Sequence, residues 1–149
     1  MYPLGHFAIS YMFACIYSRL SEEDYSISLL WFYSVLPDFD IFLPFLVHRG
    51  PTHSVILMTV LFVPLYMFYR KGIPYFIALL SHSLIGDLPT GYNGVQLFWP
   101  VSSEWISAPV WLKIHGAEQI VIEVVLFSLS LIHIYARVGL SKTKPTQYS

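Results

Sequence analysis

Residues 53–70, HSVILMTVLFVPLYMFYR, decide between the two structural classes open to this chain. Their β-branched residues would suit a buried strand, but the apolar run is longer than a strand requires. Tyr69-Arg70-Lys71-Gly72 follows as a stop signal, so we expect a helix, kinked at Pro64. Strands in a bilayer would need a closed barrel with period-2 alternation, and the sequence has no such pattern. The predicted fold class is therefore all-α.

Five apolar segments are expected to form helices: residues 4–20, 26–47, 53–70, 73–88 and 116–137. The second is expected to break at Pro37 and Pro44. The prediction is a polytopic membrane bundle of five membrane-embedded helices. Residues 94–113, interrupted by Pro100 and Pro109, are predicted to form a re-entrant or surface loop over the outer face of the site. We expect one domain over residues 1–140 and a disordered polar tail over 141–149.

The composition is that of an integral membrane protein. Hydrophobic residues make up 56% of the chain and charged residues 11%, and the mean hydropathy is +0.60. A net charge of −1, without a basic stripe, gives no general attraction for nucleic acid, so nucleic-acid binding is not expected. The single Cys15 cannot build a disulfide framework or a thiolate metal site within one chain.

The distribution of basic residues predicts the orientation in the plasma or inner membrane. If the helices alternate in direction, one side of the membrane carries Arg19, Arg70, Lys71, Arg137, Lys142 and Lys144. The other side carries Arg49 and Lys113. Cytoplasmic loops are rich in Lys and Arg, so the first side is predicted to be cytoplasmic.

The same alternation gathers ionisable residues on the non-cytoplasmic side: His6, Asp38, Asp40, His53, Asp87 and Glu118. Such residues are costly beside lipid unless they serve one another or a metal ion. Imidazole and carboxylate ligands without cysteine favour a catalytic site over a structural one. We expect one or two divalent ions, with Zn²⁺ as first choice and Mn²⁺, Mg²⁺ or Fe²⁺ as alternatives.

Three short motifs carry these ligands. Asp38-Phe39-Asp40 is expected to place two carboxylates on one side of an extended segment after a helix that Pro37 ends, where one could bridge two cations. His48 and His53 flank the turn signal Gly50-Pro51 and can converge across it.

Arg49, in the same loop, is a predicted clamp for a phosphate or carboxylate. His82 and Asp87 are five residues apart, which in an α-helix rotates one from the other by about 140°. Either Gly86 loosens the turn and brings Asp87 round, or the pair contacts different metals.

These motifs resemble the YdjM-type family of inner-membrane, metal-dependent hydrolases. The matching elements are Gly5-His6, Leu36 to Asp40, His48 to Ser54, Ser81-His82 with Asp87 to Thr90, and Leu97 to Pro100 after Gly94. The resemblance covers about residues 5–120. It departs from the family pattern His-x-x-x-Asp, because one extra residue separates His82 from Asp87. A π-bulge near Gly86 would absorb that residue.

The resemblance implies a helical membrane metallohydrolase. The metal ligands carried over from it are His6, Asp38, Asp40, His48, His53, His82 and Asp87, with Glu118 as a further catalytic candidate. A bound cation would acidify water for attack on an ester, first of all a phosphoester of a lipid or lipid-linked substrate. Asp38 or Asp40 would bridge two cations or orient the groups around them. Arg49 would hold the substrate headgroup.

Simpler interpretations stand beside this one. His6 alone suits a helix start at the interface, Asp38 and Asp40 could end a helix, and His82 could be a hydrogen-bonded core histidine. Glu123 could support the site or pack between helices. The rival function is a non-enzymatic membrane protein that binds a metal for structure, transport or sensing.

Overall fold

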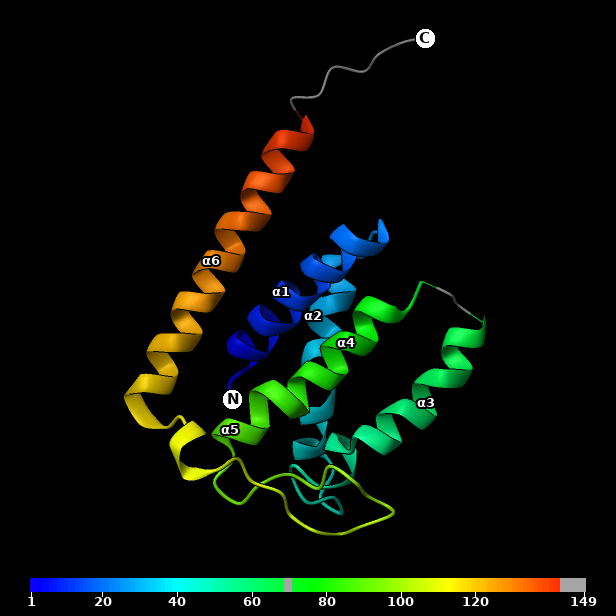
Figure 1. Cartoon of the computed structure of the whole chain (residues 1–149), viewed down its shortest axis with the longest axis vertical. Coiled ribbons are helices and arrows are strands. Elements are labelled where there is room, and N and C mark those ends of the chain that lie inside the picture. The colour runs from blue at the N-terminus through cyan, green and yellow to red at the C-terminus, as the bar shows by residue number, and fades with distance from the viewer. Residues whose placement is uncertain (69–70, 143–149) are drawn as a thin grey trace.

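The computed structural model describes residues 1–68 and 71–142, and the regular structure within them is helical (Figure 1). The α-helices are α1 (Pro3–Ser21), α2 (Ile27–Val35), α3 (Val55–Phe68), α4 (Ile73–Ser81), α5 (Leu88–Thr90) and α6 (Gly116–Lys142). Between them lie 3₁₀-helices η1 (Leu36–Phe42), η2 (Pro51–His53) and η4 (Val110–Leu112), and the π-helix η3 (His82–Asp87). The predicted all-α class is confirmed.

Helix α1 lies at the centre and contacts α2, α4 and α6 (Figure 1). The core residues are Phe7, Tyr11, Ala14, Leu30, Tyr75 and Ala78, which α1, α2 and α4 contribute. The small Ala14 and Ala78 are fully buried, so the helices can approach closely there. This packing holds the amino-terminal turn of α1 beside the carboxyl-terminal end of α4, which continues directly into η3.

The segment after α2 differs from the prediction in one respect. Leu36 keeps helical angles, with φ −56° and ψ −40°, and the chain tightens at Pro37 into η1 instead of becoming extended. Pro37 has no N–H and its φ suits a first helical turn, so it fits as the second residue of this 3₁₀-helix. The extended conformation expected for Asp38-Phe39-Asp40 is therefore wrong, and the helical structure ends at Phe42, before Pro44.

Among the described residues, α6 is the one helix that is long and apolar enough to cross a membrane. Its Gly116–Val138 stretch has a mean hydropathy of 1.9, and most of it is exposed. A hydrocarbon core of about 30 Å needs roughly twenty residues. Helices α2 and α4 have nine residues each and α3 has fourteen, so five spanning helices are not supported.

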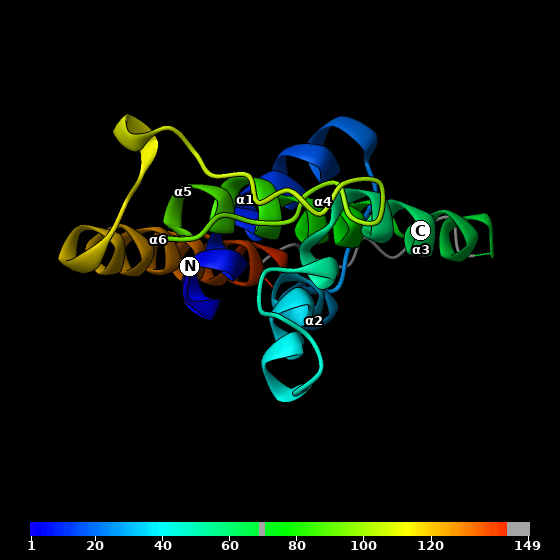
Figure 2. The ribbon, with the colours of Figure 1, turned by 90° about the horizontal axis from the view of Figure 1, so that it is seen from below.

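Residues 91–115 run irregularly across one end of the bundle, as Figures 1 and 2 show, and include the isolated bridge between Val95 and Ile106. No spanning helix forms there, as predicted. Main-chain hydrogen bonds tie this loop to its neighbours: Gln96 N donates to Arg49 O at 3.0 Å, and Val55 N donates to Leu97 O at 3.0 Å. The loop is thereby fixed against the His48–Ser54 turn.

At the carboxyl end, α6 continues to Lys142, two residues beyond the predicted domain end at residue 140. Residues 143–149 of that tail lie outside the described residues. So do Arg70 and Lys144, which entered the topology prediction. In Figure 1 the N-terminus and α5 lie at the lower end of the view, while α6 extends past α1 at the upper end.

Candidate metal centre

Five ionisable side chains from four parts of the chain meet at one end of the bundle. They are His6 in the first turns of α1, Asp38 in η1, His53 at the end of η2, and His82 and Asp87 at the two ends of η3. Asp38 is 18% exposed, and the other four side chains are fully buried. We call these five residues the inner cluster.

The inner cluster has the donor spacing of a metal site. His53 Nε2 and His82 Nε2 face each other at 3.1 Å, and each lies 3.4 Å from Asp38 Oδ1. Asp87 Oδ2 lies 3.0 Å from His53 Nε2 and 3.5 Å from His82 Nε2. Ligand atoms around a tetrahedral cation with bonds of about 2.0–2.2 Å are about 3.3–3.6 Å apart. These four side chains can therefore reach one cation.

His6 approaches the same carboxylates from the other side. Its ring stacks on that of His82 with centroids 3.6 Å apart. Its Nε2 lies 3.4 Å from Asp87 Oδ1 and 3.8 Å from Asp38 Oδ2, the oxygens that do not face the pair of His53 and His82. Each carboxylate thus presents one oxygen to each side, the arrangement that a bridging ligand needs.

Buried polar atoms without a hydrogen-bond partner test whether these residues suit a metal ion. Both ring nitrogens of His6 and Asp87 Oδ2 are buried without a hydrogen-bond partner among the described residues. Leaving such an atom unpaired costs roughly 1–3 kcal/mol, and more for a charged group. Imidazole and carboxylate donors satisfy a divalent cation of the Zn²⁺ or Mn²⁺ type. The residues present therefore fit a metal ion.

The π-helix η3 explains how His82 and Asp87 reach the same cluster. Its hydrogen bonds join residues five apart, as from Leu88 N to Ser83 O, so a residue and its fifth neighbour lie one above the other. An α-helix would turn Asp87 away from His82 by about 140°. The π-bulge suggested by the extra residue is present, and of the two arrangements left open, the structure has the converging one.

Gly86 within η3 makes room for His6. A Cβ at this position would lie 2.5 Å from both Cε1 and Nδ1 of the His6 ring, closer than atoms can pack. The absence of a side chain lets α1 bring His6 against the π-helical turn. Gly86 is therefore required because the His6 ring approaches its backbone closely, in addition to any effect that the glycine has on the π-helical turn.

Two other ring atoms fix the direction of the facing histidines. His82 Nδ1 donates to the main-chain oxygen of Ser34 at 2.6 Å, and His53 Nδ1 lies 3.0 Å from Thr52 Oγ1. A neutral imidazole with its proton on Nδ1 presents Nε2 as a ligand. Sequence reasoning missed Ser34, because a main-chain carbonyl leaves no signal in the residue type.

Asp40 lies outside the inner cluster, on the outer side of His53. Its Oδ1 accepts from His48 Nδ1 at 2.8 Å, and its Oδ2 accepts from Thr52 Oγ1 at 2.7 Å and from Arg49 N at 3.2 Å. Its Oδ2 is 3.4 Å from His53 Nδ1. In a 3₁₀-helix, residues two apart point in different directions, so Asp38 and Asp40 cannot share a face as predicted.

Among the described residues, two groups of side chains have donor atoms close enough for an ion. One is His6, Asp38, His82 and Asp87, and the other is Asp38, His48 and His53, with all donors in each group within 4.8 Å of one another. Asp38 belongs to both groups, and the bridging role that the sequence suggests for Asp38 or Asp40 stays a prediction. His48 is the exposed member, at 39%.

The charges around His53 are strongly coupled. Burial opposes ionisation of both His53 and Asp40. Hydrogen bonds with Asp38, Asp40 and Asp87 outweigh that effect and raise the pKa of His53 to about 10. Hydrogen bonds with His53, His48 and Thr52 lower the pKa of Asp40 to about 2. The carboxylates thus make this end of the bundle attractive to a cation, which would take the place of the imidazole proton.

Arg49 is held beside Asp87. Its Nη2 donates to Asp87 Oδ1 at 3.3 Å and its Nε lies 3.3 Å from Asp87 Oδ2, while the Met1 amino group also contacts Oδ1 at 2.9 Å. Arg49 adopts φ 64°, a left-handed conformation that costs a non-glycine residue roughly 1–2 kcal/mol. With five donors in a guanidinium, some N–H groups remain for a ligand.

Comparison of the sequence with known proteins identifies one family. The family described as the YdjM inner membrane protein matches the chain over residues 1–143. The chain belongs to the YdjM family. No curated protein and no solved structure gives a match. The resemblance drawn from the motifs is thus confirmed at the level of the family and its membrane location.

For this YdjM family member, the predicted role of Glu118 has no structural support. Glu118 lies exposed in the first turn of α6, and neither group of donor atoms includes it. Glu123, in contrast, is 2% exposed. Its two carboxylate oxygens each accept from Tyr2 N at 3.1 Å, at the start of α1. Glu123 thus holds the turn that carries His6.

Proposed function

We propose that this chain is a membrane-bound metal-dependent hydrolase that cleaves an ester, first of all a phosphoester of a lipid or lipid-linked substrate. The observation that carries the proposal is the buried inner cluster, in which three imidazoles and two carboxylates converge without enough hydrogen-bond partners. A chain rarely buries so many ionisable groups in an apolar bundle unless they serve function. Membership of a membrane family supports the location.

Asp38, His53, His82 and Asp87 would hold one cation, and His6 with the second oxygens of Asp38 and Asp87 would hold another. Zn²⁺ is the first choice, with Mn²⁺ or Mg²⁺ as alternatives. Such an ion supplies Lewis acidity and makes water a stronger acid near neutral pH. His48 and Asp40 would support this site through His53, at hydrogen-bond distance of one another.

The polar part of a substrate has a place to bind next to these residues. A surface hollow of about 780 Å³ is lined by Val47, His48, Arg49, Tyr92, Asn93, Gly94 and Trp105. Arg49 would bind a phosphate oxygen there through its remaining N–H groups. Asp38, the exposed member of the inner cluster, would face the reacting ester.

In the membrane, we propose that α6 spans and that the shorter helices are embedded beside it, with the inner cluster at the non-cytoplasmic side. The exposed hydrophobic residues on α3 and α6 support contact with lipid. The excess of basic residues at the other ends of the helices supports the orientation.

A turnover assay tests the proposal. Protein purified in mild detergent is analysed for metal content and assayed with bis(p-nitrophenyl) phosphate and p-nitrophenyl phosphate. We expect hydrolysis that a chelator abolishes and Zn²⁺ or Mn²⁺ restores. Arg49→Lys should raise KM, because a single ammonium cannot replace two parallel hydrogen bonds. Stoichiometric metal with no turnover on any ester would favour the rival, a non-enzymatic metal-binding membrane protein.

A further inference from the structure

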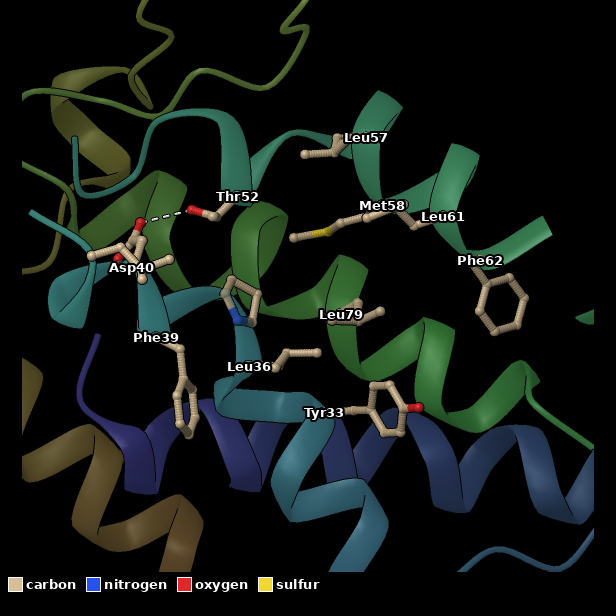
Figure 3. A pocket seen from close by; sticks show the side chains of 12 residues that line it. Tyr33, Leu36, Phe39, Asp40, Thr52, Leu57, Met58, Leu61, Phe62 and Leu79 are labelled. Carbon is tan, nitrogen blue, oxygen red and sulfur yellow. Dashed lines mark hydrogen bonds between the residues drawn. The ribbon is translucent and has the colours of Figure 1, made fainter. Parts of the chain in front are cut away.

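An apolar groove of about 340 Å³ has Asp40 and Thr52 among its lining residues (Figure 3). Its apolar walls come from α2 and η1 on one side and from α3 and α4 on the other: Tyr33, Leu57, Met58, Leu61, Phe62 and Leu79. We call it the α2–α3 groove. Figure 3 shows these side chains around one open space, with Thr52 bonded to Asp40 at one end.

The polarity of the α2–α3 groove changes along its length. Asp40 and Thr52, its polar residues at one end, belong to the hydrogen-bond network that supports His53. Pro37, which also lines the groove, directly precedes Asp38. His48 and Arg49 line the separate surface hollow described above. Asp40 and Thr52 thus connect the groove to His53 of the inner cluster, and Arg49 connects Asp87 of the inner cluster to the hollow.

The size of the groove decides what can occupy it. One turn of a helix, about 10 Å wide and about 5.4 Å high, fills roughly 420 Å³, so the groove cannot enclose a whole helical turn. A methylene is about as large as a water molecule, whose share of liquid volume is roughly 30 Å³. The groove thus has room for on the order of ten methylenes, as in one hydrocarbon chain.

We propose that the α2–α3 groove binds a single hydrocarbon chain of an amphiphilic phosphoester, whose phosphate lies at Arg49 and the inner cluster. This inference rests on the proposed hydrolase function and names its substrate class. Burying a methylene contributes about 0.8 kcal/mol, which corresponds to about fourfold in kcat/KM per methylene. Selectivity for chain length should therefore rise until the groove is filled.

Neighbouring residues of α3 offer a matched pair of variants. Leu61 lines the groove and is 66% exposed, whereas Val60 is 61% exposed and lies off the groove. Leu61→Trp should fill part of the groove, and Val60→Trp adds the same indole to the same helix. Neither change touches the buried core, so both variants should fold and keep their metal.

The first experiment measures kcat/KM of both variants and the wild type for alkyl phosphates of increasing chain length. The ratio between the two variants cancels partition of the substrate into detergent. We expect equal rates on short chains and a tenfold or greater loss for Leu61→Trp on chains of about ten carbons. Hydrolysis of every chain length with an unchanged ratio would overturn the groove proposal and leave the hydrolase proposal standing.

A binding experiment separates the two proposals when no alkyl phosphate is hydrolysed. An alkyl phosphate with a photoreactive diazirine at mid-chain is cross-linked to the whole protein, and the labelled residues are mapped by mass spectrometry. Met58 lines the groove and is 5% exposed, so free lipid has little access to it. We expect labelling of Met58 that Leu61→Trp reduces severalfold and Val60→Trp does not. Label confined to exposed residues such as Ile132 on α6 would overturn the proposal.

Discussion

The bundle holds histidines at both ends, and their surroundings differ. At the far end of α6, His133 Nδ1 lies 2.8 Å from the Tyr11 hydroxyl and 4.0 Å from Cys15 Sγ, and no carboxylate of the described residues is within 4.0 Å. In the inner cluster, three rings face two carboxylates, and His6 has no hydrogen-bond partner. The Tyr11 hydroxyl provides a partner for Nδ1 of His133, whereas both ring nitrogens of His6 are buried without a hydrogen-bond partner among the described residues. A histidine at one end of the bundle therefore does not by itself indicate a metal site.

The largest difference between the two ends should follow from removing one imidazole at each. His53→Ala removes a donor that lies within 3.5 Å of three other donors, so bound metal should fall to background and hydrolysis by on the order of 10³-fold or more. His133→Ala removes one hydrogen-bond partner of the Tyr11 hydroxyl and should change neither quantity. Elemental analysis and the phosphoester assay provide the two measurements. Equal loss of metal in both variants would mean that the inner cluster is not the metal site that distinguishes the two ends of the bundle.

A smaller effect is expected from filling the space between α1 and η3. Gly86→Ala places a Cβ against the His6 ring, so His6 must move away from Asp38 and Asp87. Metal affinity should fall by about 10–100-fold, as is typical when ligand orientation is lost. Ser83→Ala is the control, since Ser83 lies in the same π-helix with a buried hydroxyl that has no partner. Metal titration by isothermal calorimetry measures both variants.

These comparisons also show what the sequence could predict. The helices can be predicted from apolar runs, and the candidate metal ligands from histidines and aspartates in short motifs that also predict the family. The spacing of His82 and Asp87 indicates a π-bulge, because an α-helix would turn the two side chains apart, and η3 has that geometry. Backbone geometry was harder to predict. Whether Asp38-Phe39-Asp40 is extended or 3₁₀ depends on tertiary packing of η1, which a single proline does not determine.

A substitution of Asp40 can show whether this predicted metal ligand binds the ion or only orients other ligands. If it only orients His53 and His48, Asp40→Asn should lower metal affinity by about 10–100-fold without changing the number of ions bound. The amide nitrogen would oppose donors from His48, Thr52 or Arg49, which weakens the support. Asp24→Asn, in an exposed loop, serves as the charge-matched control. Loss of one whole equivalent of metal would instead make Asp40 a ligand.

The smallest predicted effect concerns the two glutamates of α6, and it separates a positioning role from a catalytic one. Glu123→Gln replaces one acceptor of Tyr2 N by an amide nitrogen, so the start of α1 loses a cap worth about 0.5–2 kcal/mol. The melting temperature should fall by a few degrees and metal affinity a few-fold, since His6 lies on that turn. Glu118→Gln, exposed and outside both donor groups, should leave both unchanged. A loss of kcat in Glu118→Gln at constant melting temperature would mean that α6 moves toward the inner cluster during turnover. Glu118 would then have the catalytic role that the family resemblance implies, and the closed arrangement of the inner cluster would be one of two states of the protein.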